Sequence, residues 1–365
     1  MIYMDYAATS PMSNKALEAY CEVAKRYYGN SASLHDLGGQ ANYFVEQARA
    51  IVARTLGVKS DGIIFTGSGT EGNLLSILSL ALASKKGKHI ISSQAEHTSV
   101  HAALNTLEKF GYSVTKLPLQ LDGCIQVNQV REAIREDTAL ITIQHVNSEI
   151  GSIQPVEEIA LIANSQNIFF HVDCVQSFCK LPTTSFCASV DAITISAHKI
   201  GGPKGCGAIF INPQIRVPSL TPGVTHERGL RGGTLDTPAI VAFATAIENY
   251  HFERQHYELL RQYLQSHLPP ACRLIECVEQ LPNICGLMMD KVEGQYVLLK
   301  LNEAGICIST GSACDIHSES GTKAIISMGY TVEEARQFFR ISFGPTTTFE
   351  EIDQLTFVLS NIVKF

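Results

Sequence analysis

Short apolar runs rich in β-branched residues alternate with helical patterns through the first two-thirds of the chain. Pro155 fits the first turn of one such helix, where a proline has no helical hydrogen bond to lose. Strands that alternate with helices of this length predict an α/β domain with a largely parallel, buried sheet. We expect strands over residues 61–66, 88–93, 112–119, 139–145, 168–173, 192–196 and 208–212, and helices over 70–86, 98–110, 127–135 and 155–167.

The pattern changes after about residue 237. A single long helical stretch over 238–268 is predicted to end at the Pro269-Pro270 pair, which indicates a domain boundary. Arg340 enters a further strand-like run. This part of the chain predicts a smaller α+β domain, with strands over 284–289 and 306–309 and helices over 295–304 and 350–363.

Composition narrows the class of protein. The chain has 365 residues, 45% of them hydrophobic and 17% charged, so it can bury a core and has room for two domains. The net charge of −7 argues against a nucleic-acid groove or an anionic membrane surface, because both need clustered Lys and Arg. No apolar stretch is long enough to cross a bilayer.

Eleven cysteines are present, an odd number without the spacing of a secreted disulfide framework. Asp5 stands where a signal peptide would carry positive charge. We therefore expect a cytoplasmic protein with reduced thiols, most of them packed as small hydrophobic residues.

A glycine-rich segment, 67–72, follows a predicted strand and opens a predicted helix. It matches G-x-G-x-x-G, but a dinucleotide site also needs an acidic residue about 20 residues further on, at the end of the next strand. That strand ends in Ser92-Ser93-Gln94. The helix N-terminus still predicts an anion site that suits a phosphate, and a tight turn without a ligand is the alternative.

Two further strand ends carry chemistry. Asp173 ends one strand at the sheet edge where α/β proteins bind ligands, although it could instead cap a helix. Lys199 follows the next strand, beside Ser196 and His198 in a glycine-rich loop. A lysine in this position suits a Schiff-base amine with phosphate-binding neighbours, and the alternative is a solvated loop lysine.

Cys314 lies in a Gly-Ser-Ala turn before a polar segment, which suits a nucleophile that must move. Arg340 suits the binding of a carboxylate, with a surface ion pair as the alternative. His97 and His101 are four residues apart but lack the glutamate of the metalloprotease pattern, and the cysteines form no Cys-x2-Cys pair. We therefore expect no metal site.

Taken together, these segments resemble the pyridoxal-phosphate enzymes of aspartate-aminotransferase fold, class V, and more narrowly the cysteine desulfurases of the NifS/IscS type. The Gly-Ser-Ala-Cys context resembles the desulfurase group with a long catalytic loop. The resemblance implies a large cofactor-binding domain over 12–250 and a small domain formed by 1–11 and 251–365. It rests on segments 4–9, 65–71, 95–97, 145–151, 171–176, 196–199, 231–234, 309–314 and 340–344.

The resemblance also implies roles for single residues. Lys199 would bind pyridoxal 5'-phosphate covalently and move the substrate's Cα proton, His97 would stack on the ring, and Cys314 would take up sulfur. Arg340 and Asn147 would bind the substrate carboxylate. The remaining cofactor contacts would come from Gly69, Thr70, Asn147, Asp173, Gln176, Ser196 and His198, and from Thr234 of the neighbouring subunit.

The implied reaction converts L-cysteine into L-alanine and a persulfide on Cys314. A homodimer is implied, with a sulfur-acceptor protein such as an iron–sulfur scaffold or a thiolation enzyme, and neither nucleic acid nor membrane as partner. Another class V enzyme, an aminotransferase or a selenocysteine lyase, is the alternative, and a catalytically silent scaffold is a third. Ser148 and Pro345 depart from the family pattern, and Asp315 and His317 match no family motif.

Overall fold

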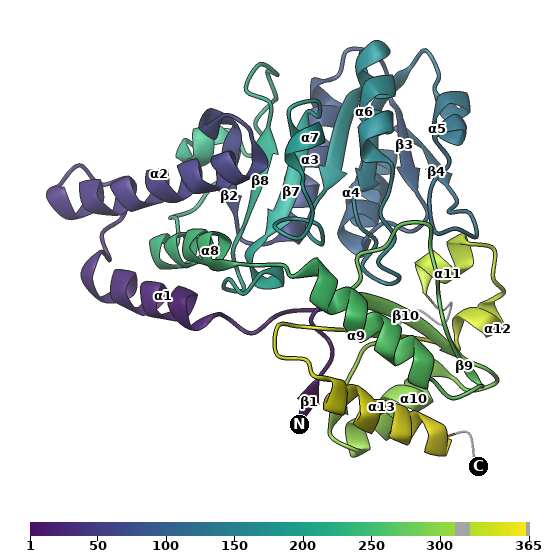
Figure 1. Cartoon of the computed structure of the whole chain (residues 1–365). Helices are drawn as coiled ribbons and strands as arrows, with labels where there is room; N and C mark the ends of the chain where they lie inside the picture. Colours follow the sequence, from purple (N-terminus) through teal and green to yellow (C-terminus); the bar gives the residue numbers. More distant parts are fainter. Residues whose placement is uncertain (311–321, 363–365) are drawn as a thin grey trace.

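The computed structural model describes residues 1–310 and 322–362 (Figure 1). Its largest element is a seven-stranded sheet in which β8 runs antiparallel to both of its neighbours and all other neighbouring strands are parallel. The predicted α/β architecture is therefore confirmed. The strand order is β2 (Ile63–Thr66), β8 (Gly207–Ile211), β7 (Ala192–Ser196), β6 (Phe169–Asp173), β5 (Thr138–Gln144), β3 (His89–Ser93) and β4 (Ser113–Leu117).

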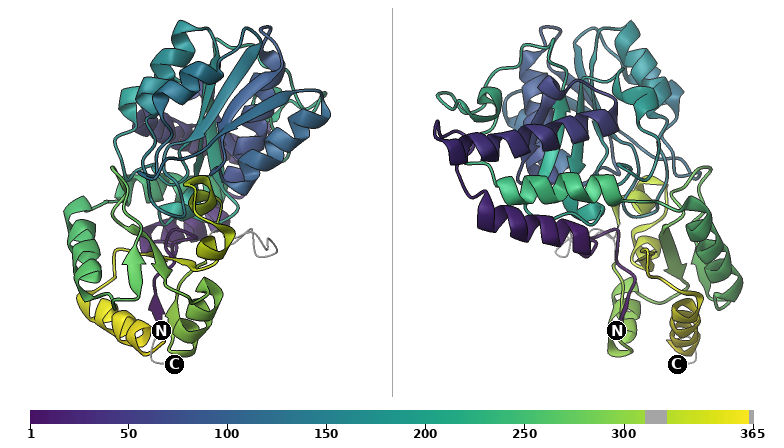
Figure 2. Two further views of the ribbon diagram at one scale, coloured as in Figure 1. Left: turned by 90° about the vertical axis from the view of Figure 1, so that its right-hand side faces the viewer. Right: turned by 60° about the vertical axis from the view of Figure 1, so that its left-hand side comes forward.

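Helices cover both faces of this sheet (Figure 2). The strands alternate between two cores: Ile64 packs with α3 and α4, whereas Phe65 packs on the opposite face. This is the period of two that a strand buried on both faces requires. The first face is covered by α3 (Gly69–Ala83) and α4 (Thr98–Lys109), and the second by α2 (Asp36–Leu56), α5 (Val127–Ala133), α6 (Val156–Ser165) and α7 (Thr184–Cys187).

Further helices pack beside the large sheet. The helices α1 (Asn14–Arg26) and α8 (Thr237–Asn249) pack on each other, and α8 also packs on α2. Three short 3₁₀ helices complete this part of the chain. They are η1 (Ser60–Gly62), η2 (Ala197–Lys199) and η3 (His226–Gly229).

A second, smaller body contains a three-stranded antiparallel sheet and has its own hydrophobic core. Both ends of the described chain lie in this smaller body (Figure 1). The N-terminal strand β1 (Ile2–Tyr3) pairs there with β11 (Ile306–Cys307). The sheet order is β12 (Phe338–Ser342), β10 (Ile284–Met289) and β9 (Cys272–Leu274). The helices are α9 (Arg254–His267), α10 (Gly294–Glu303), α11 (Lys323–Ser327), α12 (Val332–Ala335) and α13 (Phe349–Ile362).

The prediction of one helix over 238–268 is wrong. Helix α8 ends at Asn249, Tyr250 is extended (φ −82°, ψ 125°), and α9 begins at Arg254. The two helices serve different cores: α8 contributes Phe243 to the large sheet's core, and α9 contributes Leu260 to the small one. Since both halves keep a helical hydrophobic period, the pattern does not reveal the break. None of the helices in the described ranges has the length and apolarity that a bilayer span requires.

Candidate active site

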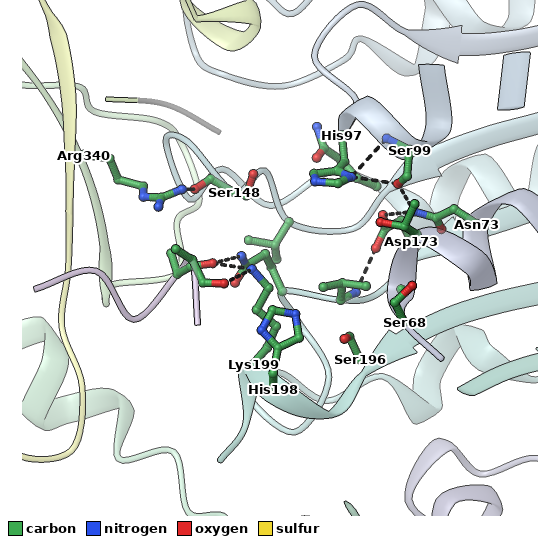
Figure 3. A pocket seen from close by; sticks show the side chains of 18 residues that line it. Ser68, Asn73, His97, Ser99, Ser148, Asp173, Ser196, His198, Lys199 and Arg340 are labelled. Carbon is green, nitrogen blue, oxygen red and sulfur yellow. Dashed lines mark hydrogen bonds between the residues drawn. The ribbon is translucent and has the colours of Figure 1, made fainter. Parts of the chain in front are cut away.

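A cavity of about 200 Å³ lies at the carboxyl ends of the parallel strands (Figure 3). The loops after β2, β3, β5, β6 and β7 all contribute to its wall, as does the segment after β1. Arg340 reaches it from β12 in the smaller body. Most residues that the sequence analysis selected line this cavity: Gly69, Thr70, His97, Asp173, Gln176, Ser196, His198, Lys199 and Arg340.

Asp173 is anchored at the cavity edge by hydrogen bonds to both carboxylate oxygens. Its Oδ1 accepts from the Val175 backbone N–H at 2.9 Å, and its Oδ2 accepts from Asn73 Nδ2 at 2.7 Å. The residue is only 6% exposed. A buried carboxylate held by two donors stays in one orientation, so its charge has a fixed place in the cavity.

The same amide connects Asp173 to His97. Asn73 Nδ2 also donates to Ser99 Oγ at 2.9 Å, and Ser99 Oγ lies 2.7 Å from His97 Nδ1. His97 Nδ1 additionally accepts from the Ser99 N–H, which makes His97 the cap of α4 rather than a helical residue. With Nδ1 acting as acceptor, a neutral imidazole carries its proton on Nε2.

Asn73 and Ser99 were not selected from the sequence. The sequence does place Asn73 one turn into α3, and the other buried side chains of this helix are mostly small or apolar. An amide in that position needs polar partners, and the sheet edge is where they are found.

Lys199 ends η2, and its ammonium group is held by main-chain oxygens. Nζ donates to the carbonyl oxygens of Ala7 and Ala8, the second at 2.9 Å. Burial, together with the positive charges of Arg340 and Lys180, lowers the pKa of Lys199 to about 7. A substantial share of the amine is therefore neutral at neutral pH, as nucleophilic or basic chemistry requires.

A cradle for an anion lies beside Lys199, at the N-terminus of α3. Ser196 Oγ is buried and has no hydrogen-bond partner among the described residues. A Cβ atom at Gly69 would lie 2.9 Å from Val175 Cγ2, so only glycine lets the backbone lie this close. Because the first N–H groups of a helix have no helical acceptor, they can donate here together with the Ser196 hydroxyl.

His198 lines the same cavity as a neutral side chain. Its Nδ1 lies 3.1 Å from Thr9 Oγ1. Burial, followed by the charges of Lys199 and Lys204, lowers the pKa of His198 to about 4. At neutral pH it can donate one hydrogen bond to a phosphate but adds no charge.

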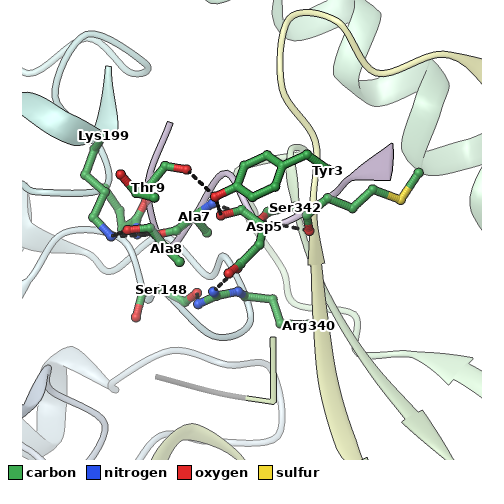
Figure 4. A network of polar contacts seen from close by, with 11 residues as sticks. Tyr3, Asp5, Ala7, Ala8, Thr9, Ser148, Lys199, Arg340 and Ser342 are labelled. Atoms are coloured by element: carbon green, nitrogen blue, oxygen red, sulfur yellow. Dashed lines mark hydrogen bonds and ion pairs between the residues drawn. The ribbon is translucent and has the colours of Figure 1, made fainter. Parts of the chain in front are cut away.

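Arg340 is 2% exposed and is fixed from two directions (Figure 4). Its Nη2 lies 2.7 Å from Asp5 Oδ1, and its Nη1 donates to the Ser148 carbonyl oxygen at 2.8 Å. Nε is buried without a partner among the described residues. The guanidinium group therefore keeps donors for an incoming carboxylate while its orientation is already set.

Two selected residues of the described ranges do not line this cavity. The Asn147 side chain is used within its own turn, where Oδ1 accepts from the N–H groups of Glu149 and Ile150 and Nδ2 donates to Ala95 O. Thr234 is exposed and does not line the cavity. Cys314, with Asp315 and His317, lies outside the described residues.

The anchored carboxylate, the lysine of lowered pKa and the anion cradle are the groups that bind pyridoxal 5'-phosphate in transferases of the aspartate-aminotransferase fold. The chain belongs to the aminotransferase class-V family, whose sequence model matches residues 2–355. Enzymes of this family depend on pyridoxal 5'-phosphate, and the residues present in this structure fit that cofactor.

Particular relatives are similar over nearly the whole chain. A protein of Bacillus subtilis named "Putative cysteine desulfurase NifS" is 40% identical, over 97% of this chain and 93% of its own length. A solved structure titled "NIFS-LIKE PROTEIN" superposes with a TM-score of 0.92 at 31% identity, over 100% of this chain and 99% of that one. Another, "SspA in complex with cysteine", has a TM-score of 0.85 at 34% identity and covers 95% and 100%.

Proposed function

We propose that this protein is a cysteine desulfurase that converts L-cysteine into L-alanine and retains the sulfur as a persulfide on Cys314. The observation that carries the proposal is the placement of the Lys199 amine, the Asp173 carboxylate and the Arg340 guanidinium around one cavity. The names of the relatives support the choice of reaction, and the cysteine complex of a similar structure supports the choice of substrate.

The family resemblance implies which residues would hold the cofactor, and their common place around the cavity supports these roles. Lys199 would bind it covalently, Asp173 would face the ring nitrogen, and His97 would stack on the ring. The phosphate would lie in the cradle formed by the α3 N-terminus, Thr70, Ser196 and His198, with Gln176 toward the ring hydroxyl. When bound, pyridoxal 5'-phosphate supplies an electron sink for the charge that develops at the substrate's Cα.

The protein's own groups then act in a defined order. Arg340 binds the substrate carboxylate and sets the direction of the Cα–H bond. The neutral amine of Lys199 takes the Cα proton, which is a step that its lowered pKa favours. His97 Nδ1 is engaged in the hydrogen-bond network that ends at Asp173. Its other ring nitrogen, Nε2, carries the proton that His97 can donate. The Cys314 thiolate would attack the substrate sulfur, so that the S–S bond forms as the Cβ–Sγ bond breaks; the electron pair of that bond stays with Cβ, which takes a proton to become the methyl group of alanine.

Most of the other thiols in the described ranges are partly or fully buried and are poor candidates for this last step. All of them are free, and burial raises the pKa of Cys187, Cys206 and Cys272 to about 12. A thiol with so high a pKa is almost entirely protonated at neutral pH and is a weak nucleophile. Burial does not exclude the exposed Cys21 or the half-buried Cys307, so the assignment of the sulfur to Cys314 rests on its Gly-Ser-Ala-Cys context.

Partners and domain limits are part of the same proposal. Thr234 is exposed and does not line its own cavity, which supports the proposal that it reaches the phosphate of a second subunit in a homodimer. A sulfur-acceptor protein, an iron–sulfur scaffold or a thiolation enzyme, would receive the persulfide in the cytoplasm. A second hydrophobic core, formed only by residues of 1–11 and 251–365, supports a domain over 12–250 and one formed by 1–11 and 251–365, although Met288, Ile325 and Phe338 of the second part pack into the core of the large sheet.

The decisive experiment mixes the purified protein with L-cysteine and measures alanine, protein-bound sulfane sulfur and the visible spectrum. Wild type is expected to absorb in the visible region, release alanine and carry sulfur on Cys314. Lys199→Ala should lose the covalent cofactor, and Cys314→Ala should lose bound sulfur. The matched control is Cys21→Ala, which removes an exposed thiol. Full sulfur release by Cys314→Ala, or turnover that requires a keto acid, would contradict the proposal.

A further inference from the structure

A second lysine, Lys180, is buried next to the proposed catalytic lysine. A cavity of about 510 Å³ lies behind the first one, and Lys199 lines both of them. Lys180 lines only the second cavity and is 7% exposed. A lysine this deeply buried is uncommon unless it is paired with an acid.

The backbone before Lys180 is in an unusual conformation. Cys179 has φ 60°, in the left-handed region that residues other than glycine rarely adopt. The Lys180 N–H donates to Ser177 O at 2.9 Å, which closes the turn. Non-glycine residues are kept in this region only where the surroundings hold them there, and such residues concentrate at functional sites.

The contacts of Lys180 lead to Lys199. Its Nζ donates to Gln176 Oε1 at 3.3 Å, and Gln176 Nε2 donates to Ala7 O at 2.8 Å. The same Ala7 oxygen accepts from Lys199 Nζ. The oxygen and nitrogen of the Gln176 amide could in principle exchange places by a 180° turn. The Lys180 ammonium group needs the amide oxygen and the Ala7 carbonyl needs the amide N–H, so a single orientation is permitted.

Among the described residues Lys180 forms no ion pair, and its hydrogen-bond acceptor there is the neutral Gln176 amide, although Glu253 lines the same cavity. Burial lowers the pKa of Lys180 to about 8, so it is mostly protonated at neutral pH. The Lys180 ammonium group therefore places a positive charge in the wall of the second cavity, which Lys199 also lines.

We propose that Lys180 is a positioning residue, which fixes the Gln176 amide toward Ala7 and holds a positive charge that favours the neutral amine of Lys199. The inference deepens the proposed function, because it rests on the role assigned to Lys199. Lys180 does not touch the substrate cavity and acts through Gln176 and through its charge.

The charges that face Lys199 come from several elements. Arg340 on β12 and Lys180 lower its pKa, whereas Asp5 after β1 and Asp173 on β6 raise it. His198, its neighbour in η2, is neutral near pH 7. Burial is the largest cause of the lowered pKa, and the two cations add to its effect while the two carboxylates oppose it. Loss of Lys180 would leave Arg340 as the remaining cation among these four charges.

The test measures the proton equilibrium of Lys199 directly in the full-length, cofactor-free chain. Trace labelling with acetic anhydride from pH 5.5 to 9.5, read by peptide mass spectrometry against the exposed Lys85, gives the midpoint of Lys199 reactivity. Wild type, Lys180→Gln and Lys180→Arg are compared. The matched control is Lys204→Gln, which removes an exposed lysine from the same glycine-rich loop.

Lys180→Gln is expected to raise the midpoint by about half a unit or more, because a like charge has been removed. Lys180→Arg and Lys204→Gln are expected to keep the wild-type midpoint. If Lys180→Gln does not fold, Lys180→Met, which keeps the aliphatic stem, is measured in its place with the same expectation. An unchanged midpoint in the neutral variant, or an equal shift in Lys180→Arg, would overturn the inference.

Failure of this inference can be told apart from failure of the proposed function. Labelling reads Lys199 without cofactor or substrate, so its result does not depend on whether the loaded enzyme releases alanine. Conversely, an absent visible spectrum in the wild-type holoprotein would refute the function and leave the labelling result in place.

Discussion

The ion pair of Arg49 and Glu227 permits a prediction whose size follows from the structure. Glu227 accepts from both terminal nitrogens of Arg49, at 2.8 and 3.0 Å, and its Oε2 also accepts from the Phe65 N–H at 2.6 Å. The two side chains are 7% and 3% exposed. Glu227 itself has φ 43°, so this network holds a strained turn against β2.

Glu227→Gln keeps the shape of the side chain but leaves the guanidinium group of Arg49 without its buried counter-charge. Removing one partner of a buried pair costs about 3–5 kcal/mol. Arg49 retains Ile63 O and the half-exposed Glu46 as partners, so we expect the lower end of that range. For a chain of 365 residues, about 3 kcal/mol corresponds to a fall in Tm of roughly 4 °C.

Thermal unfolding and urea unfolding measure this effect. Glu248→Gln is the control, because it breaks the ion pair of Glu248 and Arg54, whose side chains are 49% and 70% exposed. Loss of this exposed pair should lower the free energy of unfolding by less than about 1 kcal/mol. Since the turn precedes Thr234, which we propose reaches the phosphate of a second subunit, Glu227→Gln should also weaken cofactor retention if the proposed homodimer forms. Equal stability of the two variants would refute the reasoning about burial.

Three further outcomes are expected at the cavity. The rate at which the cofactor-free chain binds pyridoxal 5'-phosphate should rise with pH and level off above pH 7, because the neutral form of Lys199 increases as pH passes its pKa of about 7. Stopped-flow absorbance measures this rate, and a flat profile from pH 6 to 9 would contradict the expectation. Gly69→Ala should weaken phosphate and cofactor binding roughly tenfold or more, since its Cβ would lie 2.9 Å from Val175 and 3.4 Å from Ser196; equilibrium dialysis measures this, and wild-type affinity would refute the close approach. Asn73→Leu should release Asp173 Oδ2 and Ser99 from their shared donor and cost about 1–3 kcal/mol, visible as a lower Tm and a changed cofactor spectrum.

The sequence predicted those parts of the site that lie where a strand ends. Gly69, Asp173 and Lys199 each follow a strand of apolar residues, and parallel strands bring their carboxyl ends to one edge. Most strand limits also agree within a few residues, because a strand buried on both faces leaves a clear apolar run. The pattern does not predict helices α1 and α2.

Residues that act through a partner distant in the sequence could not be predicted. Asn73 is separated from Asp173 by 100 positions, and Asp5 from Arg340 by 335. Neither has a local pattern that names its partner, since a single sequence gives spacing along the chain but no contact across it. Arg340 was expected to bind a carboxylate, and the structure shows that Asp5 already orients it.

The two bodies of the molecule supply different parts of the site. The large sheet carries Lys199, Asp173 and the anion cradle, whereas the small body carries Arg340 and the first residues of the chain, whose Ala7 and Ala8 oxygens hold the Lys199 amine. Any rotation between the bodies would therefore change the substrate clamp and the lysine environment together. Because Arg340 also lowers the pKa of Lys199, binding of a substrate carboxylate to Arg340 would raise it, so the base is stronger when substrate is bound than before.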